Sequence, residues 1–554
     1  MLAIRISAGL LCLSLTMLSI PSQVRACGGF FCTTVPINQA AEQIVFRQEG
    51  NEVTAMVRIL YSGNAEDFSW VVPVPDTPQI SLGANVTFNE LDFATRPQFI
   101  LQTNGRVCAK DEFIALPVAS PLVDAADSED GGVTIEEELS LGPFDIDIVS
   151  SDNADDMSIW LQDNGYAIGD RGQELLEPYI LAGMKFVALK LQSGEASGSI
   201  QPLIMRYPSE KPMVPIRLTA IAAEEDMGVL VWVVNDARAV PENYEHVTPN
   251  YTKLNWYSGS FNAYSSYQTL ITDAMNEAGG QGFATDYAGS ITDSIHGSLT
   301  GAAIVEDNLA QLDTIGDDAQ YLVNSLFMTT DTSASLASLQ TILPLPDGLS
   351  TNVYFDAAQL ASTFTPDELR QARIDTRQAI VTRELEPIRN GVDLLPEGAY
   401  LTRLYTTLSA DEMTVDPSFN YNSSMPEQAL RREAQLNASC ENDVSRWSLT
   451  LGKGTGREGE KVLEVTGQPI PVGVLPTPID DQPAAFLRQR TSADAAPELL
   501  FQAESSLLQI GADGSSGGSD IETDDNDGFL GAFGFIGLIS GVFAVSLRRR
   551  WNWV

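Results

Sequence analysis

The chain has 554 residues, with 74 acidic against 32 basic side chains and a formal net charge of −42 at pH 7. A surface this acidic repels nucleic acid and anionic headgroups, which excludes a protein that binds a phosphate backbone. There are two histidines, His246 and His296, and neither has a second histidine at ligand spacing. A three-histidine zinc site and the HExxH motif of metalloproteases are therefore excluded as well.

The N-terminus predicts a secretory signal peptide over residues 1–26. Residues 1–20 carry one early positive charge and then an apolar run, and small residues occupy the cleavage positions before Cys27. Cys12 would leave with the signal peptide. A retained anchor stays open as an alternative. So does lipidation of Cys27, although Arg25 stands where a lipobox favours a small or apolar residue.

The first globular segment predicts strands and then a helix. Residues 42–80 alternate apolar and polar side chains around turn signals, which indicates a run of antiparallel strands. Thr87 with Glu90 three residues later predicts a capping box at the start of a helix. Residues 124–138 contain seven acidic side chains and no basic one, so we expect a solvated loop there.

Two short helices are expected next, in ADDMSIWLQDNGY and GQELLEPYILAG. Gly165 and Gly183 would end them, and a strand would begin near Lys185.

Residues 212–236 predict a β-hairpin. This segment and residues 56–73 each combine an arginine-containing strand, a Glu-Asp turn and a Trp-Val-Val strand, so a duplicated motif and chance both stay open. For Trp70 and Trp232 we expect core packing.

The middle of the chain predicts helices. Residues 263–280 have a helical period and a glycine stop, and residues 301–342 continue in short amphipathic pieces. From Tyr400 to Gly467 the pattern returns to strand. The motif GTGREG, Gly454 to Gly459, lies between two alternating segments and predicts a hairpin loop instead of a phosphate-binding turn.

The clearest helix is TPDELRQARIDTRQAIVTRELEP. Thr365 would cap it, Pro366 would occupy its first turn, Glu368 would complete the capping box and Pro387 would end it.

The C-terminus carries a second membrane signal. Residues 529–547 are uncharged and long enough for a helical span, and three arginines follow. The positive-inside rule places residues 548–554 in the cytoplasm and the preceding chain outside. Residues 506–528 are acidic and rich in glycine and serine, which indicates a flexible stalk. Retention of the span and its removal as a sorting signal both stay open.

Four cysteines remain after signal removal: Cys27, Cys32, Cys108 and Cys440. An even number in an exported chain favours disulfides, and the spacing of CGGFFC lacks the CxxC pattern of zinc and redox sites. We expect pairs Cys27–Cys32 and Cys108–Cys440. The alternative joins each N-terminal cysteine to a distant one.

These signals predict an α+β fold, with antiparallel-sheet-rich N-terminal and C-terminal parts flanking a helical middle, plus one C-terminal transmembrane helix. The expected organisation in chain order is signal peptide 1–26, an N-terminal α+β domain 27–240, a mainly helical region 241–400, a β-containing region 401–505, stalk 506–528, transmembrane helix 529–547 and cytoplasmic tail 548–554.

Several long segments also resemble a known family. They include ACGGFFC, NAEDFSWVVPVPDTP, MVPIRLTAIAAEEDMGVLVWVVNDARAVPENY, NEAGGQGFATDYAG and GAYLTRLYTTLSADEMTVDPSFN. Over most of residues 26–450 the chain resembles the bacterial exported family known as domain of unknown function 2330. The resemblance implies an exported envelope protein, often with a C-terminal anchor. It implies no activity and transfers no catalytic residue.

The expected function is that of a membrane-anchored ectodomain in the cell envelope, with a non-catalytic binding or structural role toward an unknown envelope protein or ligand. Two alternatives stay open: a hydrolase that uses carboxylates, alone or with a divalent cation, and an accessory or sensor subunit of a membrane complex. We expect no cofactor, with calcium on converging carboxylates as the alternative, and no nucleic acid partner.

Overall fold

The computed structural model describes residues 38–62, 68–105, 134–166, 171–192, 200–221, 223–256, 259–329, 332–441, 444–466, 482–505 and 507–510. The signal peptide, the apolar C-terminal segment and the basic tail predicted above lie outside these residues, as does the predicted stalk beyond residue 510. The stalk prediction is wrong at its start, where Leu508–Ile510 form strand β21 and pair with strand β18 (Lys461–Thr466). Among the helices that the structure describes, none is both long and apolar enough to cross a membrane.

The strands are β1 (Asn38–Glu49), β2 (Glu52–Ser62), β3 (Ser69–Val74), β4 (Gln79–Leu82), β5 (Gln98–Gly105), β6 (Thr134–Leu141), β7 (Phe144–Ser150), β8 (Lys185–Leu191), β9 (Leu203–Pro208), β10 (Ala223–Asn235), β11 (Ala239–Pro241), β12 (Glu245–Pro249), β13 (Gly282–Ser290), β14 (Tyr400–Leu408), β15 (Phe419–Tyr421), β16 (Arg431–Glu441), β17 (Val444–Leu451), β18 (Lys461–Thr466), β19 (Ala485–Arg490), β20 (Glu498–Gln502) and β21 (Leu508–Ile510).

The helices are α1 (Asn85–Thr95), α2 (Ala154–Asp163), α3 (Gly172–Leu181), α4 (Ile216–Thr219), α5 (Gly259–Glu277), α6 (Asp293–His296), α7 (Gly301–Asp313), α8 (Asp318–Ser325), α9 (Thr332–Ile342), α10 (Ala357–Thr363), α11 (Pro366–Ile380) and α12 (Glu386–Val392), with 3₁₀-helices η3 (Tyr251–Lys253) and η4 (Thr351–Phe355) and a π-helix η5 (Val381–Leu385).

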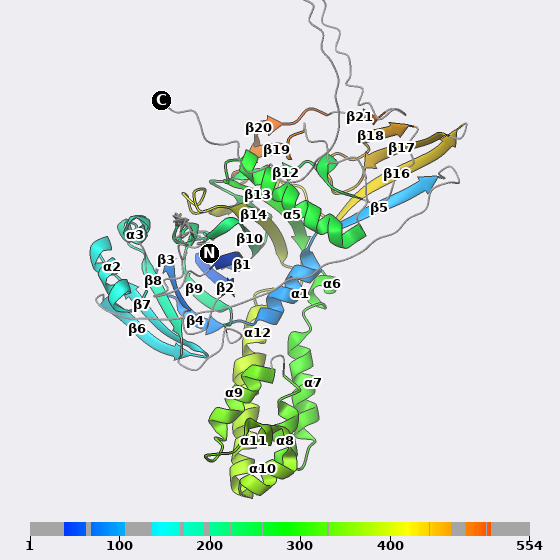
Figure 1. Ribbon diagram of the computed structural model, residues 1–554. Coiled ribbons are helices and arrows are strands. Elements are labelled where there is room, and N and C mark those ends of the chain that lie inside the picture. The colour runs from blue at the N-terminus through cyan, green and yellow to red at the C-terminus, as the bar shows by residue number, and fades with distance from the viewer. Residues whose placement is uncertain are drawn as a thin grey trace, which may run out of the picture.

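A ten-stranded sheet forms the centre of the molecule, in the order β20-β19-β12-β13-β14-β10-β1-β2-β9-β4. It takes strands from both ends of the described chain, and β1 pairs with β10 in parallel but with β2 in antiparallel register. One face is covered by a four-stranded sheet, β3-β8-β7-β6, whose outer face carries α2 and α3 (Figure 1). The opposite face packs on α1 and α6.

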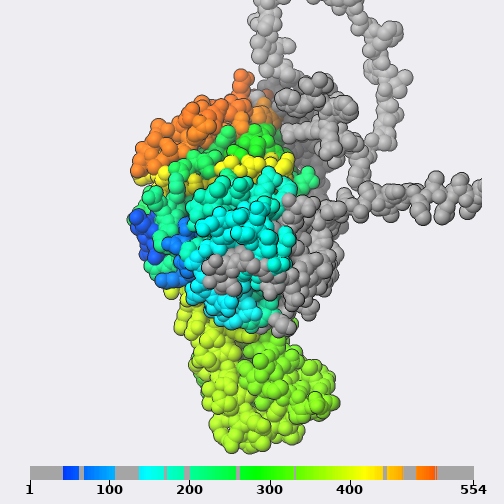
Figure 2. All heavy atoms as spheres, turned by 90° about the vertical axis from the view of Figure 1, so that its left-hand side faces the viewer, coloured from blue at the N-terminus to red at the C-terminus, as the bar shows by residue number. Residues whose placement is uncertain are grey.

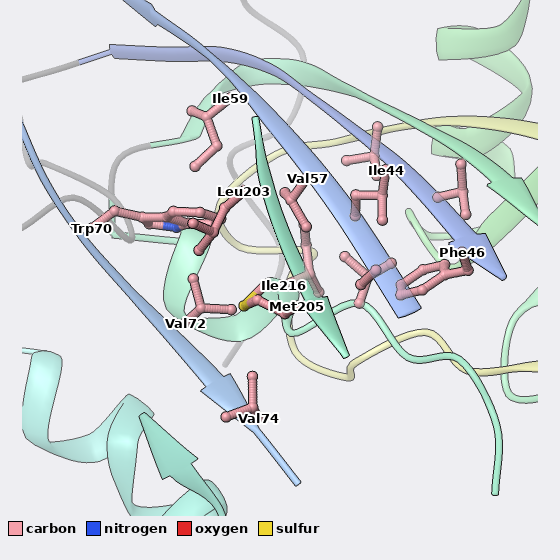
Figure 3. Packing of buried hydrophobic residues seen from close by; sticks show 14 of the residues in the cluster. Ile44, Phe46, Val57, Ile59, Trp70, Val72, Val74, Leu203, Met205 and Ile216 are labelled. Carbon is pink, nitrogen blue, oxygen red and sulfur yellow. The ribbon is translucent and has the colours of Figure 1, made fainter. Parts of the chain in front are cut away.

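The two sheets meet through alternating apolar side chains. Trp70 and Val72 of β3 face Leu203 and Met205 of β9, and Val57 of β2 lies beside them (Figure 3). Because successive side chains of a strand point to opposite faces, each strand supplies every second residue to this core. Trp70 and Trp232 are both buried in apolar clusters, as predicted.

A five-stranded sheet, β21-β18-β17-β16-β5, packs with α5 beside the end of the large sheet that contains β12 and β13 (Figure 1). The predicted hairpin around GTGREG is confirmed: β17 and β18 are antiparallel, and Gly454, Gly456 and Gly459 between them have positive φ angles. The predicted helices before Gly165 and Gly183 are confirmed as α2 and α3.

Helices α7 to α12, residues 301–392, form a helical arm. The arm projects from the part of the molecule that contains the sheets, and we call that part the body (Figures 1 and 2). The arm has its own apolar core, built around Tyr321, Leu322, Tyr354 and Leu360. The mixed α+β class predicted from the sequence is therefore correct.

Two predictions, for residues 124–138 and 212–236, are wrong, and the duplicated motif that stayed open beside chance is not found. The hairpin predicted for residues 212–236 is instead the short helix α4 followed by β10, because Pro212 and Pro215 lack the N–H groups that a ladder strand needs. Residues 56–73 contain β2 at the corresponding place, so the two segments do not repeat one motif. Part of the acidic segment 124–138 belongs to strand β6, and the rest lies outside the described residues.

The capping box predicted at Thr87 is also wrong. The N-cap of helix α1 is Ala84, three residues before Thr87, and Ala84 makes no side-chain capping bond. Thr87 is fully buried, and a Cβ on Gly391 of α12 would lie 3.0 Å from its Oγ1, so the two helices pack closely there. Glu90 caps a different helix: its carboxylate accepts hydrogen bonds from Thr300 and Gly301 at the start of α7.

Pro387 does not end its helix, although the capping box of Thr365, Pro366 and Glu368 at the start is confirmed. The chain passes from α11 through the π-helix η5 into α12, and Pro387 lies in the first turn of α12. Proline is tolerated there because the carbonyl that its missing N–H would have reached, that of Arg383, accepts a hydrogen bond from Gln201 instead.

Candidate functional site: a cavity between arm and body

A cavity of about 430 Å³ lies where the helical arm meets the body, and we call it the junction cavity. Its volume falls within the range of small-molecule sites, about 300–1,000 Å³. The lining combines small apolar residues with amides, hydroxyls and one residue of each charge. The polar lining residues are Asn85, Asn89, Gln201, Ser325, Thr329, Ser335, Ser338, Thr376, Arg383 and Glu384.

Helix α1 supplies Asn85 and Asn89 to the body side of the cavity. Asn85 donates from Nδ2 to the carbonyl of Ile200 at 2.9 Å, and Asn89 accepts at Oδ1 from Nη1 of Arg58 at 2.6 Å. Arg58 also donates from Nε to Gln43 Oε1 at 2.9 Å. Burial lowers the pKa of Arg58 to about 10, partly opposed by Asp92, so the guanidinium stays charged at neutral pH. These bonds fix where both asparagine amides point.

The arm side is shaped by the π-helix η5, which supplies Arg383 and Glu384. Pro387 has no N–H to donate to the carbonyl four residues earlier, that of Arg383. Gln201 of the body donates from Nε2 to this carbonyl at 2.9 Å. A single π-turn inside a helix is rare and frequently marks a functional site. Here it places two opposite charges beside the cavity.

Thr376 of α11 lines the junction cavity about two helical turns before these charges. The side chain is 7% exposed, and no described residue forms a hydrogen bond with its Oγ1. A buried hydroxyl without a partner costs roughly 1–3 kcal/mol. A bound ligand that reaches this hydroxyl would remove that penalty.

Hydroxyl groups from α8, α9 and their connection form the remaining polar wall. Ser335 donates from Oγ to Thr329 Oγ1 at 2.6 Å, and Ser325 donates to the carbonyl of Leu322 at 2.7 Å. Each hydroxyl keeps acceptor capacity after donating one hydrogen bond. The wall can therefore accept from ligand N–H or O–H groups.

The arm is attached to the body by polar contacts around the cavity. Besides the Glu90 cap on α7, Asn390 donates from Nδ2 to the carbonyl of Leu82 at 3.0 Å. Arg47 donates from Nη1 to the carbonyl of Asp393 at 2.7 Å. These contacts join the arm to the body.

A second polar cluster lies inside the large sheet, and we did not predict it from the sequence. Arg403 pairs with Asp286 at 3.0 Å and with Asp92 at 2.7 Å, and Tyr267 donates a hydrogen bond to Asp286. Arg432 donates to the carbonyl of Asp286 at 2.8 Å. Burial raises the pKa of Asp286, although Arg403 partly opposes this. Charges this well paired and enclosed stabilise a particular packing, so we assign the cluster a structural role.

The two histidines lie apart from the junction cavity. His246 Nε2 is 3.1 Å from Thr285 Oγ1 and 3.3 Å from Arg238 Nη2 inside the sheet. Burial, assisted by the charge of Arg238, lowers the pKa of His246 to about 3. His296 Nδ1 is 3.2 Å from the carbonyl of Leu395. Both imidazoles therefore make hydrogen-bond contacts outside the cavity lining.

Of the cysteines predicted to form disulfides, Cys27, Cys32 and Cys108 lie outside the described residues. Cys440 is at the exposed end of β16. Within the described part of the chain, no group of three or more His, Cys, Asp or Glu side chains is arranged to hold a metal ion.

The chain therefore folds into a large α+β protein, and a cavity of the size of a small-molecule site lies between its arm and its body. The family model of domain of unknown function 2330, described as an uncharacterized protein conserved in bacteria, matches residues 21–346. The match covers more than half of the chain, so the chain belongs to this family, as its sequence motifs indicated. It includes the body side of the cavity, whereas Thr376, Arg383 and Glu384 lie beyond it. No curated protein and no solved structure matches the chain.

Proposed function

We propose that this chain is an exported, membrane-anchored protein of the cell envelope, and that its ectodomain binds a small ligand in the junction cavity without converting it. The observation that carries the proposal is the junction cavity itself. It has the volume of a ligand site, it is lined by oriented polar groups, and one of these groups is a buried hydroxyl with no hydrogen-bond partner among the described residues.

The chemistry of the lining favours binding over hydrolysis. Among the described residues that line the cavity, Glu384 is the one carboxylate. Hydrolysis by paired carboxylates requires two of them on either side of the reacting bond. Neither histidine belongs to the lining, so general base catalysis by imidazole is not available there.

The export proposal rests on the signal-like N-terminus and the apolar segment 529–547 with its following arginines. The strand register adds support for the disulfide pairing. Gly105 of β5 lies opposite Ala438 of β16 in a parallel pair, so Cys108 and Cys440 both follow within three residues of that point. Such a pairing suits an oxidising compartment.

The test uses the full-length protein purified in detergent. It is equilibrated with the small-molecule fraction of a bacterial envelope, washed and heat-denatured, and the released compounds are identified by mass spectrometry. The matched control is Ala379→Phe, which places a ring in the cavity lining without changing charge. We expect a compound that wild type retains unchanged and Ala379→Phe does not. Equal retention by both proteins, or recovery of a chemically converted compound, would contradict the proposal.

A further inference from the structure

We propose that the junction cavity binds an uncharged acetamido sugar, that is, a hexose with an N-acetylated amine, either free or at the end of a longer glycan. This inference rests on the proposed function, because it names the ligand class of the same cavity.

The charged residues of the lining favour an uncharged ligand. Arg383 and Glu384 both line the cavity, and each already interacts with another group of the protein. Neither residue therefore offers a free charge to a ligand. A charged ligand would lose hydration on entry without gaining a counter-charge, which is costly, whereas neutral polar groups can be satisfied by hydrogen bonds.

Two asparagines of α1 leave one acceptor and one donor on the same face of the helix. Asn85 and Asn89 are four residues apart, so their side chains lie one above the other. Asn85 donates from Nδ2 to the carbonyl of Ile200, which leaves its Oδ1 as an acceptor. Asn89 accepts at Oδ1 from Arg58, which leaves its Nδ2 as a donor. In the part of the chain that the structure describes, no residue forms a hydrogen bond with either remaining atom.

An acetamido group is the complement of this pair. It has one N–H to donate to Asn85 Oδ1 and one carbonyl to accept from Asn89 Nδ2. Side chains four apart on a helix are about 5–6 Å apart at Cβ, so a single planar amide can reach both. The methyl group of the acetamido would pack on Ala84 and Val86, which also line the cavity.

Hydroxyl groups of the arm favour a polyhydroxylated ligand. Thr376 is 7% exposed, and its Oγ1 has no hydrogen-bond partner among the described residues. Ser335 donates its hydroxyl hydrogen to Thr329, so it keeps acceptor capacity. Sugar hydroxyls both donate and accept, so they can bond to Thr376 and to Ser335 alike. The C–H face of the sugar ring would lie against Ala379 and Ile380.

The first experiment compares three probes by titration calorimetry on the full-length protein, in a detergent without a sugar headgroup. The probes are N-acetylglucosamine, glucose, which lacks the acetamido group, and N-cyclohexylacetamide, which lacks the hydroxyls. N-acetylglucosamine should bind about tenfold more tightly than either, because each of the others loses one set of hydrogen bonds. Equally tight binding of glucose or of N-cyclohexylacetamide would overturn the assignment.

The second experiment removes the donor of Asn89 without removing its bond to Arg58. Asn89→Asp keeps an oxygen for the guanidinium and replaces the Nδ2 donor by a second acceptor, so the melting temperature of the free protein should stay unchanged or rise. The variant should bind N-acetylglucosamine and N-cyclohexylacetamide about tenfold more weakly than wild type, and glucose equally well.

Asn324→Asp is the matched control. Asn324 also accepts at Oδ1 from one side chain, with 2.7 Å to Gln320 Nε2, and it is not part of the described lining. It should bind every probe as wild type does. Undiminished binding of N-acetylglucosamine by Asn89→Asp, or an equal loss in the control, would overturn the role given to the asparagine pair.

The third experiment tests the arm hydroxyls. Thr376→Val keeps the shape of the side chain and removes a buried hydroxyl without a partner among the described residues, so the melting temperature of the free protein should not fall. It should weaken both sugars several-fold and leave N-cyclohexylacetamide unchanged, and Thr376→Ser should restore most of the affinity. Unchanged binding of both sugars, or an equal loss for all three probes, would overturn the role of the hydroxyl.

A fourth probe separates the two sources of the sugar. Di-N-acetylchitobiose carries the same acetamido sugar linked to a second one. Binding at least as tight as that of the monosaccharide would support the end of a glycan as the ligand. Binding about tenfold weaker would support the free sugar.

The two proposals fail separately. Retention of an envelope compound without an acetamido group, with no binding of N-acetylglucosamine, would overturn the sugar assignment and leave the binding function standing. Absence of any compound that distinguishes wild type from Ala379→Phe, together with no binding of N-acetylglucosamine, would overturn both.

Discussion

Arg403 of β14 and Asp286 of β13 form an ion pair across adjacent strands of the large sheet, with 3.0 Å between Nε and Oδ2 and each side chain 1% exposed. The same guanidinium pairs with Asp92 of α1. One buried side chain therefore joins two strands to helix α1, whose N-terminal half, with Asn85 and Asn89, forms the body side of the junction cavity.

Breaking this pair should destabilise the protein strongly. Arg403→Met would leave Asp286 buried without its counter-charge, and the loss of one partner of a buried ion pair lowers the free energy of unfolding by about 3–5 kcal/mol. Chemical denaturation of the full-length protein measures the effect. Arg490→Met is the control, since Arg490 and Glu498 are paired at the surface, where such pairs contribute about 0–1 kcal/mol. Similar losses in the two variants would refute the special role of the buried pair.

His246 should make the protein less stable in mild acid. The folded state keeps it neutral down to a pKa of about 3, whereas the unfolded chain protonates it near its ordinary value of 6.5. The unfolded state therefore binds the extra proton as pH falls through this window, and the stabilisation present above pH 6.5 is lost towards pH 3. Between pH 7 and pH 5 the loss is about 2 kcal/mol.

The measurement compares the unfolding free energy of wild type and His246→Gln across this range. Glutamine still forms hydrogen bonds but does not titrate, so its curve should be flatter by that amount. Parallel curves would show that folding does not lower the pKa of His246, so that the folded and unfolded proteins bind this proton over the same pH range.

Local features of the fold were predictable from the sequence because they depend on neighbours in the chain. The capping box of Thr365 and Glu368 needs only residues three apart, and the glycines that end α2 and α3 need only a positive φ angle. The parallel pairing of β1 with β10 was not predictable in this way. It joins segments about 180 residues apart, and no local pattern encodes that contact.

The junction cavity was missed for the same reason. Its polar walls come from Asn85, Gln201, Ser335 and Arg383, which meet only after the arm folds back on the body. The sequence did contain one usable signal, a proline at 387 inside an otherwise helical pattern, which we interpreted as a stop. The arginine in the apolar strand YLTRLYTTL was the corresponding signal for the buried ion pair.

The cysteines give a prediction about covalent structure. Non-reducing peptide mapping should show Cys27–Cys32 and Cys108–Cys440 and no free thiol. Replacing Cys440 by serine should lower the free energy of unfolding by about 2–5 kcal/mol, because the bridge closes a very long loop in the unfolded chain. Two titratable thiols in the folded protein, or a bridge from Cys27 to Cys440, would contradict this pairing.

Membrane topology follows from the signal peptide and the positive-inside rule. Protease added to intact spheroplasts should degrade residues 27–510, and the same treatment of lysed cells should give no additional cleavage of that region. A cytoplasmic control protein must stay intact in the first sample. Protection of residues 27–510 in intact spheroplasts would contradict export of the ectodomain.

Hydrogen–deuterium exchange of the full-length protein, with and without the envelope compound that it retains, tests the binding site most directly. Our account predicts slower exchange on both sides of the junction cavity, in peptides that cover residues 84–90 and 376–385, and no such change in Ala379→Phe. Protection confined to other regions, or protection that persists in Ala379→Phe, would contradict a ligand site between the arm and the body.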